Sequence, residues 1–227
     1  MDHDPYLNLA REHSLGLEVT KERIILFFWQ NENTIVVGRN QDVQKECKAR
    51  AFLDEGGRIA RRRSGGGAVY HDLGNLNISI ISAQTAVEKV RYHSIMLNVL
   101  RSFGVEGKYN GRNDILVNGK KISGSAYYSD GDTVYQHACL LVCADKNKIS
   151  RFLTPDISKM SRNHVSSVTS RIINLCEIDP SIGIGSVIDT FVAEMKAVPF
   201  SKHDRNRDIE KLRRFYSSEE WIFGGNK

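Results

Sequence analysis

The sequence predicts an α+β domain in which helices pack on mixed or antiparallel sheets. Three observations favour this class: short runs of β-branched and aromatic residues fill much of the first two thirds, a clear hairpin pattern surrounds Asn118–Gly119, and the last third is mainly helical in character. The 227 residues suffice for one large domain, and no Pro/Ser-rich linker divides them. We expect this domain over residues 1–200 and a helical tail over residues 201–227.

A helix and two strands are expected first. Asp4 is a favourable N-cap and Pro5 suits the first helical position, so the first helix begins there. Residues 23–30 are rich in β-branched and aromatic side chains and are typical of a buried strand. Residues 34–40 form a second strand that ends at a glycine turn, and the short link Asn-Glu-Asn between the two strands suggests a hairpin.

Helices and strands follow one another through the middle of the chain. We expect a helix from Val43 to Glu55 that two glycines close. The strands expected next are residues 59–62, 68–71 and 75–82, the last with partial alternation of polar and apolar side chains. Thr85 and Glu88 match a capping box, and mostly helical apolar spacing continues from there to Phe103.

Asn118–Gly119 is the strongest turn signal in the chain. Asn-Gly is the preferred pair for a type I′ turn, and strand-like residues flank it on both sides, so we expect a β-hairpin. Residues 133–143 predict another strand. The helical stretches expected in the last third are Lys146–Leu153, Val187–Met195 and Ile209–Tyr216.

The composition argues against several classes of function. A net charge of +5 suits an anionic ligand or an acidic partner, but no basic tract is interleaved with aromatic residues, so nucleic-acid binding is not expected. The longest apolar run, residues 24–29, is too short to span a bilayer, and the N-terminus lacks the apolar stretch of a signal peptide. The four cysteines, Cys47, Cys139, Cys143 and Cys176, form no C-x-x-C pair, so a zinc knuckle is not expected. Cys139 and Cys143 sit in an apolar run, where a free cysteine behaves as a small buried hydrophobe, and we expect a reducing compartment.

The run RRRSGGGAVYHD, Arg61 to Asp72, combines three arginines with three glycines. Glycine lets a ligand approach the backbone closely, successive N–H groups can form an anion-binding nest, and arginine can pair bidentately with phosphate or carboxylate. A flexible surface loop beside solvated arginines explains the same run. The run matches neither a Walker A loop, because no G-K-[ST] follows the glycines, nor a G-x-G-x-x-G fingerprint.

Two further segments carry charged groups that suit an anion site. Lys121 is one of two adjacent lysines on a predicted strand, so one of them faces inward, where it could hold a phosphate and a carboxylate together; a solvated edge-strand lysine is the alternative. Asp114 could bind Mg²⁺ beside phosphates or simply cap a turn. His71 and His137 have no partner at a familiar metal-ligand spacing, so we expect core or supporting roles.

Seven segments, taken in order, resemble the lipoate–protein ligase A family. They are DPYLNLA, FFWQNENTIVVGRNQ, KEC, RRRSGGGAVYHDLGNLN, GRNDI, KKISGSAY and SVTSRIINL, and the resemblance they carry extends over most of residues 4–176. Residues 221–225 resemble a further landmark of the family. The combination of the glycine motif with K-x-S-G-S-A is far more specific than either motif alone. The resemblance implies the α+β fold that this family shares with the biotin protein ligases.

The resemblance also implies a two-step reaction and a set of site residues. Lipoate and ATP form lipoyl-adenylate and pyrophosphate, and a lysine of a lipoyl-acceptor domain then attacks the adenylate and releases AMP. Lys121 matches the family's catalytic lysine and would act as an electrostatic clamp. The resemblance assigns ATP binding to Arg62, Gly67, Ala68, Val69, Tyr70 and Lys121, lipoate binding to Arg63, Gly65, Gly66, His71 and Lys121, and Mg²⁺ to Asp114. Leu9 and Val69 are candidates to line an apolar tunnel for the dithiolane tail.

The implied partners are the lipoyl domains of 2-oxoacid dehydrogenase acyltransferase subunits and the glycine-cleavage carrier protein. Full ligases of the family continue into a small C-terminal accessory domain, so we expect an accessory part on a separate chain or a truncated sequence. The expected compartment is the cytoplasm, or the mitochondrion in a eukaryote, although no transit peptide is visible. No nucleic acid and no membrane are expected.

Several alternatives stay open at this point. Arg63 and Tyr128 stand where other family members differ, which leaves open a lipoyltransferase that uses preformed lipoyl-AMP. Acyltransferases of this fold that form a thioester carry a cysteine shortly before the lysine, and residues 78–120 contain none. A biotin ligase has a different glycine-arginine loop. A non-catalytic module that binds lipoyl domains is the alternative from another class.

Overall fold

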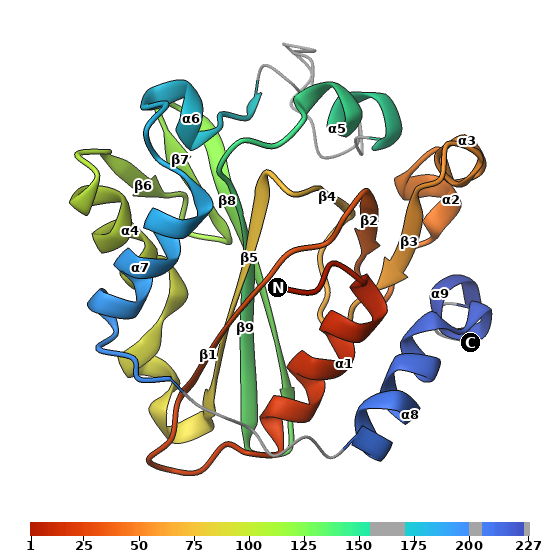
Figure 1. The fold of residues 1–227 in the computed structure, drawn as a ribbon, viewed down its shortest axis with the longest axis horizontal. Helices are drawn as coiled ribbons and strands as arrows, with labels where there is room; N and C mark the ends of the chain where they lie inside the picture. The colour runs from red at the N-terminus through yellow and green to blue at the C-terminus, as the bar shows by residue number, and fades with distance from the viewer. Residues whose placement is uncertain (155–170, 200–205, 225–227) are drawn as a thin grey trace.

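The main sheet has six strands, and every neighbouring pair in it is antiparallel. The computed structural model describes residues 1–154, 171–199 and 206–224 (Figure 1). In spatial order the strands are β1 (Ile25–Trp29), β5 (Asn75–Ala83), β9 (Thr133–Leu141), β8 (Lys120–Asp130), β7 (Asp114–Val117) and β6 (Gly107–Tyr109). The expected α+β class is confirmed.

A smaller sheet of three strands lies beside the main sheet. β2 (Thr34–Val37) is its centre and pairs in parallel with β3 (Arg58–Arg61) and antiparallel with β4 (Val69–His71). The expected hairpin between residues 23–30 and 34–40 is therefore wrong, because β1 and β2 belong to different sheets. Gln30 and Asn31 of the connection are buried and anchored: the Asn8 amide donates to Gln30 O at 2.8 Å, and the Gln30 amide donates to Leu73 O at 2.7 Å.

Two predicted helices differ in detail from the structure. The helix expected over residues 43–55 is split into α2 (Val43–Glu46) and α3 (Ala49–Asp54), because Cys47 forms a bridge with Leu153 and the Lys48 N–H donates to Phe152 O at 2.9 Å. The capping box at Thr85 and Glu88 is absent. That segment is a 3₁₀ helix, η1 (Gln84–Val90), and α4 (Tyr92–Ser102) begins after it, where the Gln136 side chain accepts from the Tyr92 N–H at 3.2 Å.

The remaining local predictions agree with the structure. Asp4 caps α1 (Pro5–Gly16) by accepting from the N–H groups of Tyr6 and Leu7. Asn118 and Gly119 both have positive φ, 52° and 74°, as a type I′ turn between β7 and β8 requires. The helices found in the last third are α5 (Lys146–Phe152), α6 (Leu175–Ile178), α7 (Ile184–Glu194), α8 (Asn206–Ser217) and α9 (Glu219–Gly224).

The two faces of the main sheet have different chemistry. Leu76, Ile78 and Ile80 of β5 pack into the largest apolar core, which α4 and α7 cover. The alternate residues of the same strand, Asn75, Asn77 and Ser79, are also buried but lie on the opposite face, where Ser79 donates to Glu12 of α1 and Asn77 lines a cavity with Val36 of β2. The partial alternation seen in the sequence is therefore the signature of a strand with one apolar and one polar buried face.

The stretch expected as a C-terminal tail packs on the first helix. α8 runs beside α1, and Tyr216 of α8 is buried with Leu9 and Trp29. Trp221 of α9 donates from its indole N–H to Arg61 O at 2.8 Å. Gly225, the last residue of the landmark over residues 221–225, and residues 167–170 of the SVTSRIINL motif lie outside the described residues.

Two of the four cysteines form a disulfide, so the expectation that Cys143 is a free cysteine is wrong. Cys143 follows β9 and Cys176 lies in α6, and their Cα atoms are 5.5 Å apart. The chain brings them together because the Cys176 N–H donates to Val142 O at 2.9 Å and the Asn174 amide donates to Ala144 O, also at 2.9 Å. Cys47 and Cys139 are free.

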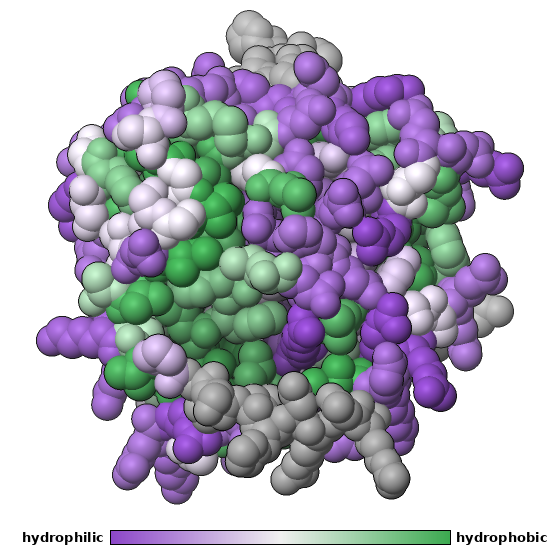
Figure 2. Space-filling view, in the orientation of Figure 1, coloured by the Kyte–Doolittle hydropathy of each residue, from purple (hydrophilic) through white to green (hydrophobic). Residues whose placement is uncertain are grey.

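An apolar groove runs along β1, the edge strand of the main sheet. Figure 2 shows hydrophobic side chains gathered over β1 and α7 on this face. The groove has a volume of about 930 Å³, and its lining includes Leu26, Phe28, Ile95 and Met195. Within the described ranges, no helix has both the length and the apolarity that crossing a bilayer requires.

Candidate active site

A row of directly opposed residues crosses the polar face of the main sheet. Asn77 on β5 lies opposite Trp29 on β1 and Cys139 on β9. Cys139 lies opposite Gly124 on β8, and Gly124 lies opposite Asp114 on β7. Gly66 and Gly67, in the loop between β3 and β4 of the smaller sheet, line the same cavity as Asn77, Gly124 and Cys139 of this row. The site is therefore a space between two sheets, with one wall set by strand register.

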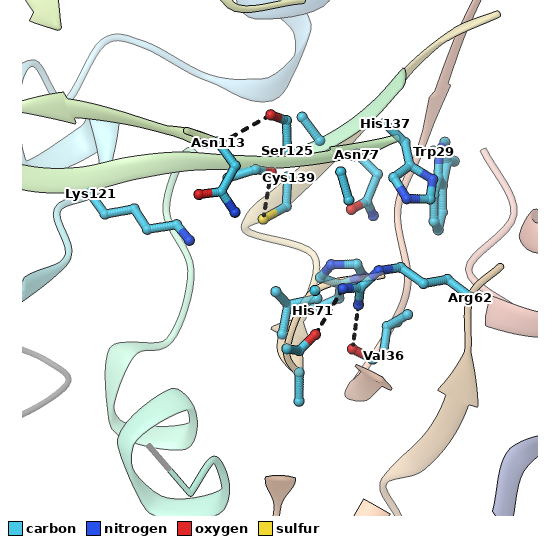
Figure 3. A pocket seen from close by; sticks show the side chains of 17 residues that line it. Trp29, Val36, Arg62, His71, Asn77, Asn113, Lys121, Ser125, His137 and Cys139 are labelled. Atoms are coloured by element: carbon cyan, nitrogen blue, oxygen red, sulfur yellow. Dashed lines mark hydrogen bonds between the residues drawn. The ribbon is translucent and has the colours of Figure 1, made fainter. Parts of the chain in front are cut away.

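Two cavities occupy this space and meet at Lys121, and Figure 3 shows the side chains that line the inner one. The inner cavity has a volume of about 200 Å³, and its lining includes Trp29, Val36, Arg62, Gly66, Gly67, His71, Asn77, Asn113, Ser125 and His137. The outer cavity has a volume of about 610 Å³, and its lining includes Tyr70, Asp114, Leu116, Ile122, Ile149, Leu153, Arg171 and Ile172. Both are lined by Ala68, Val69, Lys121, Gly124 and Cys139. A ligand with two parts can thus place one part in each cavity and their junction at Lys121.

Lys121 is held in place by its neighbours on the sheet. Its Nζ atom lies 2.8 Å from Asp114 Oδ1 in an ion pair, and its side chain is 35% exposed. A Cβ atom on Gly124 would lie 2.6 Å from Nζ, so glycine at this position leaves the space that the ammonium occupies. The backbone carbonyl of Lys121 accepts from the Ile173 N–H at 3.0 Å, so β8 is flanked on both sides here and Lys121 is not an edge-strand lysine.

Arg61 has a purely structural role. Its side chain is 1% exposed and donates to the carbonyl oxygens of Trp221 and Ile222 in α9. It also donates to the carbonyls of Gly38 and Arg39 at 2.8 and 2.9 Å. It therefore joins the C-terminal helix to the loop that follows β2 and has no contact with the cavities.

Arg62 holds the backbone of the glycine run through hydrogen bonds from its guanidinium. Its guanidinium donates to Gly65 O at 2.7 Å, Gly67 O at 2.8 Å, Val36 O at 3.1 Å and Ser64 Oγ at 3.0 Å. Among the described residues these bonds use all its N–H groups except one on Nη1, and Arg62 lines the inner cavity, where a ligand could accept from that group. Burial lowers the pKa of Arg62 to about 10, so the side chain is still charged at neutral pH.

Arg63 points away from both cavities. It forms an ion pair with Asp130 at 2.8 Å and a hydrogen bond with the His13 ring at 2.9 Å, and its guanidinium lies over the Tyr128 ring. Burial alone lowers its pKa, but the bond to Asp130 and neighbouring negative charge raise it above the ordinary value. The three consecutive arginines thus have three different environments.

Most of the predicted site residues meet at the two cavities. The inner cavity collects Arg62, Gly66, Gly67, Ala68, Val69, His71 and Lys121, and the outer cavity adds Tyr70 and Asp114. Arg63 and Gly65 line neither cavity, and Leu9 is buried in the apolar cluster around Trp29. The individual roles that the resemblance assigns to these residues stay predictions.

A buried chain of hydrogen bonds behind the inner cavity was missed by the sequence reasoning. Ser79 donates to Glu12 Oε1 at 2.5 Å, and the same carboxylate lies 3.0 Å from His137 Nδ1. His137 Nε2 lies 2.6 Å from Ser64 Oγ, which in turn accepts from Arg62. This chain of hydrogen bonds therefore connects α1 to the loop that precedes the three glycines.

Glu12 is the anionic member of this chain. Burial by itself raises the pKa of Glu12, but the charge of His137, with hydrogen bonds from His137 and Ser79, lowers it below the ordinary value overall. Glu12 and His137 are 125 positions apart, so no local pattern could have paired them. The polar positions of β5 were the available signal, because a buried polar strand face requires partners.

Comparison with known proteins identifies the family. The model of the lipoyl protein ligase A/B catalytic domain matches residues 4–196. The chain belongs to the lipoyl protein ligase A/B catalytic-domain family. Lipoate-protein ligase A of Bdellovibrio bacteriovorus is 33% identical over 97% of this chain and 69% of that relative. The family suggested by the sequence motifs is therefore confirmed.

Solved structures of the family share the whole fold. LipL1 of P. falciparum, determined in complex with lipoate, superposes with a TM-score of 0.81 at 29% identity, over 100% of this chain and 73% of that chain. A lipoate-protein ligase A bound with ATP superposes with a TM-score of 0.80 at 25% identity, over 98% of this chain and 95% of that chain.

Proposed function

We propose that this chain is an ATP-dependent lipoate–protein ligase, which activates lipoate as lipoyl-AMP and transfers the lipoyl group to a lysine of an acceptor domain. The observation that carries the proposal is the meeting of two cavities at a single lysine. Family membership supports it, and so do the lipoate and the ATP bound to the two solved relatives.

The two cavities suit the two substrates. The inner cavity is the smaller one, and Trp29, Val36 and Val69 give it apolar walls for an acyl chain. The outer cavity, with Tyr70 and Leu116 among its lining residues, would hold the nucleotide. The lipoate carboxylate and the α-phosphate then meet at Lys121. Both groups are anionic, so the ammonium offsets their repulsion and holds them in position for reaction.

In the first step a carboxylate oxygen of lipoate attacks the α-phosphorus of ATP. The new O–P bond forms as the bond to the β-phosphate oxygen breaks, and pyrophosphate leaves with the electron pair. Negative charge on the transferring phosphoryl oxygens faces Lys121, and the remaining Nη1 N–H of Arg62 is available to oxygen atoms in the inner cavity. A single well-placed donor of this kind is worth about 10²–10³ in kcat.

Protein side chains supply only part of the ligands that a Mg²⁺ ion needs at this site. Among the described residues, no group of three or more His, Cys, Asp or Glu side chains could hold a metal ion. Asp114 offers one carboxylate at the wall of the outer cavity, which suits an ion held mainly by phosphate oxygens and water. Bound there, Mg²⁺ would neutralise charge on the phosphates.

In the second step the neutral amine of the acceptor lysine attacks the carbonyl carbon of lipoyl-AMP. A C–N bond forms, the C–O bond to the phosphate breaks, AMP leaves and the amine proton passes to solvent. We propose lipoyl domains of 2-oxoacid dehydrogenase acyltransferases and the glycine-cleavage carrier protein as acceptors. The net charge of +5 would speed association with acidic domains of this type.

A gel-shift lipoylation assay tests the proposal. The acceptor domain is incubated with the chain and either lipoate plus ATP or preformed lipoyl-AMP. Product in both reactions is expected, with a loss of at least about 10²-fold for Lys121→Ala because the clamp is removed. Product from lipoyl-AMP alone would identify a transferase instead of a ligase. Binding of the acceptor without product in either reaction would show a non-catalytic module.

A further inference from the structure

We infer that His71 and Asn77 form a pair of hydrogen-bond donors that makes the inner cavity select an acyl tail carrying a hydrogen-bond acceptor. The inference rests on the proposed function, because it places a carboxylate at Lys121 and the tail of the acid in the inner cavity. The expected result is tighter binding of lipoate, whose tail carries ring sulfurs, than of octanoate, whose tail ends in a methyl group.

The hydrogen bonds around His71 fix which ring nitrogen carries the proton. Asn8 donates from its amide nitrogen to Asn31 Oδ1 at 3.1 Å, and also to Gln30 O at 2.8 Å. Asn31 therefore presents its NH₂ group to His71 Nδ1, at 3.2 Å, and Nδ1 accepts. Because burial lowers the pKa of His71 to about 3, the ring is neutral and its one N–H is on Nε2.

His71 Nε2 has no hydrogen-bond partner among the described residues, although the side chain is 3% exposed. It lines the inner cavity. Buried N–H groups almost always have partners in folded proteins, so an N–H without one at a cavity wall indicates a ligand or a water.

Asn77 provides a second hydrogen-bond donor on the opposite wall of the inner cavity. Its Oδ1 accepts from the Asn75 amide at 3.2 Å, which leaves Nδ2 as the group directed elsewhere. Within the part of the chain that the structure describes, Nδ2 also lacks a partner, and Asn77 is 2% exposed. Figure 3 shows the Asn77 amide and the His71 ring on facing sides of the cavity, with Lys121 at one side of both.

The two N–H groups distinguish lipoate from octanoate because a bound tail without an acceptor leaves both of them without a hydrogen bond. A dithiolane ring carries two sulfur atoms whose lone pairs are weak acceptors, and it can face both N–H groups. The end of an octanoyl chain offers only C–H groups, so it displaces water from both donors without replacing those hydrogen bonds. The proposed function places the carboxylate at Lys121, where the two cavities meet, so the tail is the part of the acid that reaches the pair.

Equilibrium binding of lipoate and octanoate to the wild type and to four variants tests the inference. His71→Asn keeps an acceptor for Asn31, because its Oδ1 replaces Nδ1, but no group of asparagine reaches the position of Nε2. We expect the ratio of lipoate affinity to octanoate affinity to fall about tenfold. His71→Gln can place an amide N–H near the Nε2 position, so it should recover part of the ratio. Asn77→Leu should lower the ratio in the same direction.

Ser82→Ala is the matched control. Ser82 lies on the same strand as Asn77, is fully buried, and its hydroxyl also lacks a partner among the described residues, but it lines neither cavity. Its affinity ratio should equal that of the wild type. Thermal melting at neutral pH confirms that each variant is folded. Because Trp29 lines the inner cavity, tryptophan fluorescence follows binding without any turnover.

Every result of this experiment either supports or overturns the inference. An unchanged ratio in His71→Asn, an equal loss of both affinities, or an equal change in Ser82→Ala overturns the inference, and so does a wild type that binds neither acid. A wild type that binds lipoate with the expected ratio but never transfers it leaves the inference standing and removes the proposed function.

Discussion

His71 allows a quantitative prediction because the fold keeps its imidazole neutral. Burial, with smaller contributions from the charges of Arg62 and His137, lowers the pKa of His71 from 6.5 to about 3. In the unfolded chain the ring regains its ordinary pKa, so below pH 6.5 the unfolded state binds a proton that the folded state excludes. This contribution to stability is therefore complete above pH 6.5 and declines as the pH falls toward 3.

The size of the effect follows from the two pKa values. One pH unit below the unfolded pKa corresponds to about 1.36 kcal/mol, so at pH 5 the unfolded state gains about 2 kcal/mol from protonation of His71. The substitution His71→Asn removes the titrating group while its amide oxygen still accepts from Asn31. We predict that the wild type loses about 2 kcal/mol more free energy of unfolding than His71→Asn between about pH 7.5 and about pH 5.

Urea denaturation followed by tryptophan fluorescence at the two pH values measures this difference. Carboxylates that titrate over the same range are present in both proteins, so their contributions cancel. Equal losses in the two proteins would refute the reasoning, because His71 would then be protonated in the folded state. A larger loss in the variant would refute it as well.

Three further substitutions test the packing of the site. Gly124→Ala should fold normally but lose most lipoylation activity in the gel-shift assay, because its Cβ would lie 2.6 Å from Lys121 Nζ; wild-type activity would contradict this. Gly38→Ala should lower both activity and melting temperature, with an unfolding cost of about 1–3 kcal/mol, because its Cβ would lie 1.9 Å from Gly66 O. Glu12→Gln should cost about 3 kcal/mol near pH 7 by urea denaturation. Because the pKa of Glu12 is lowered in the fold, that difference should shrink as the pH falls below 4.5, and a constant difference would rule out an ionised Glu12.

Local chemistry predicted those parts of the fold that depend on a few adjacent residues. The Asp4 cap and the Asn118–Gly119 turn are of this kind, since each is decided by the side chains or φ angles of neighbouring positions. Strand partners are not local. Residues 31–33 looked like a hairpin link, yet buried hydrogen bonds of Gln30 and Asn31 carry the chain from one sheet to the other.

The site residues divide in the same way, into those that a local motif predicts and those that depend on distant parts of the chain. The glycine run and Lys121 were identified from sequence because each motif is continuous along the chain. The Glu12–His137–Ser64 chain was not, because its members come from α1, β9 and the loop after β3. The disulfide between Cys143 and Cys176 was missed for the same reason, since their pairing depends on the return of α6 to the end of β9.

The three arginines show how the charge at the site differs from the charge in the sequence. β3 ends at Arg61, so strand alternation sends Arg61 toward α9 and Arg62 toward the cavities, and Arg63 lies beyond the strand beside Asp130. Arg62, Lys121 and Arg171 then supply positive charge to the two cavities, and the Asp114 carboxylate offsets one of them. A lipoate carboxylate and a triphosphate together bring more negative charge than this arrangement balances. The proposed reaction therefore requires additional positive charge on the phosphates, which is the contribution that Mg²⁺ beside Asp114 would make.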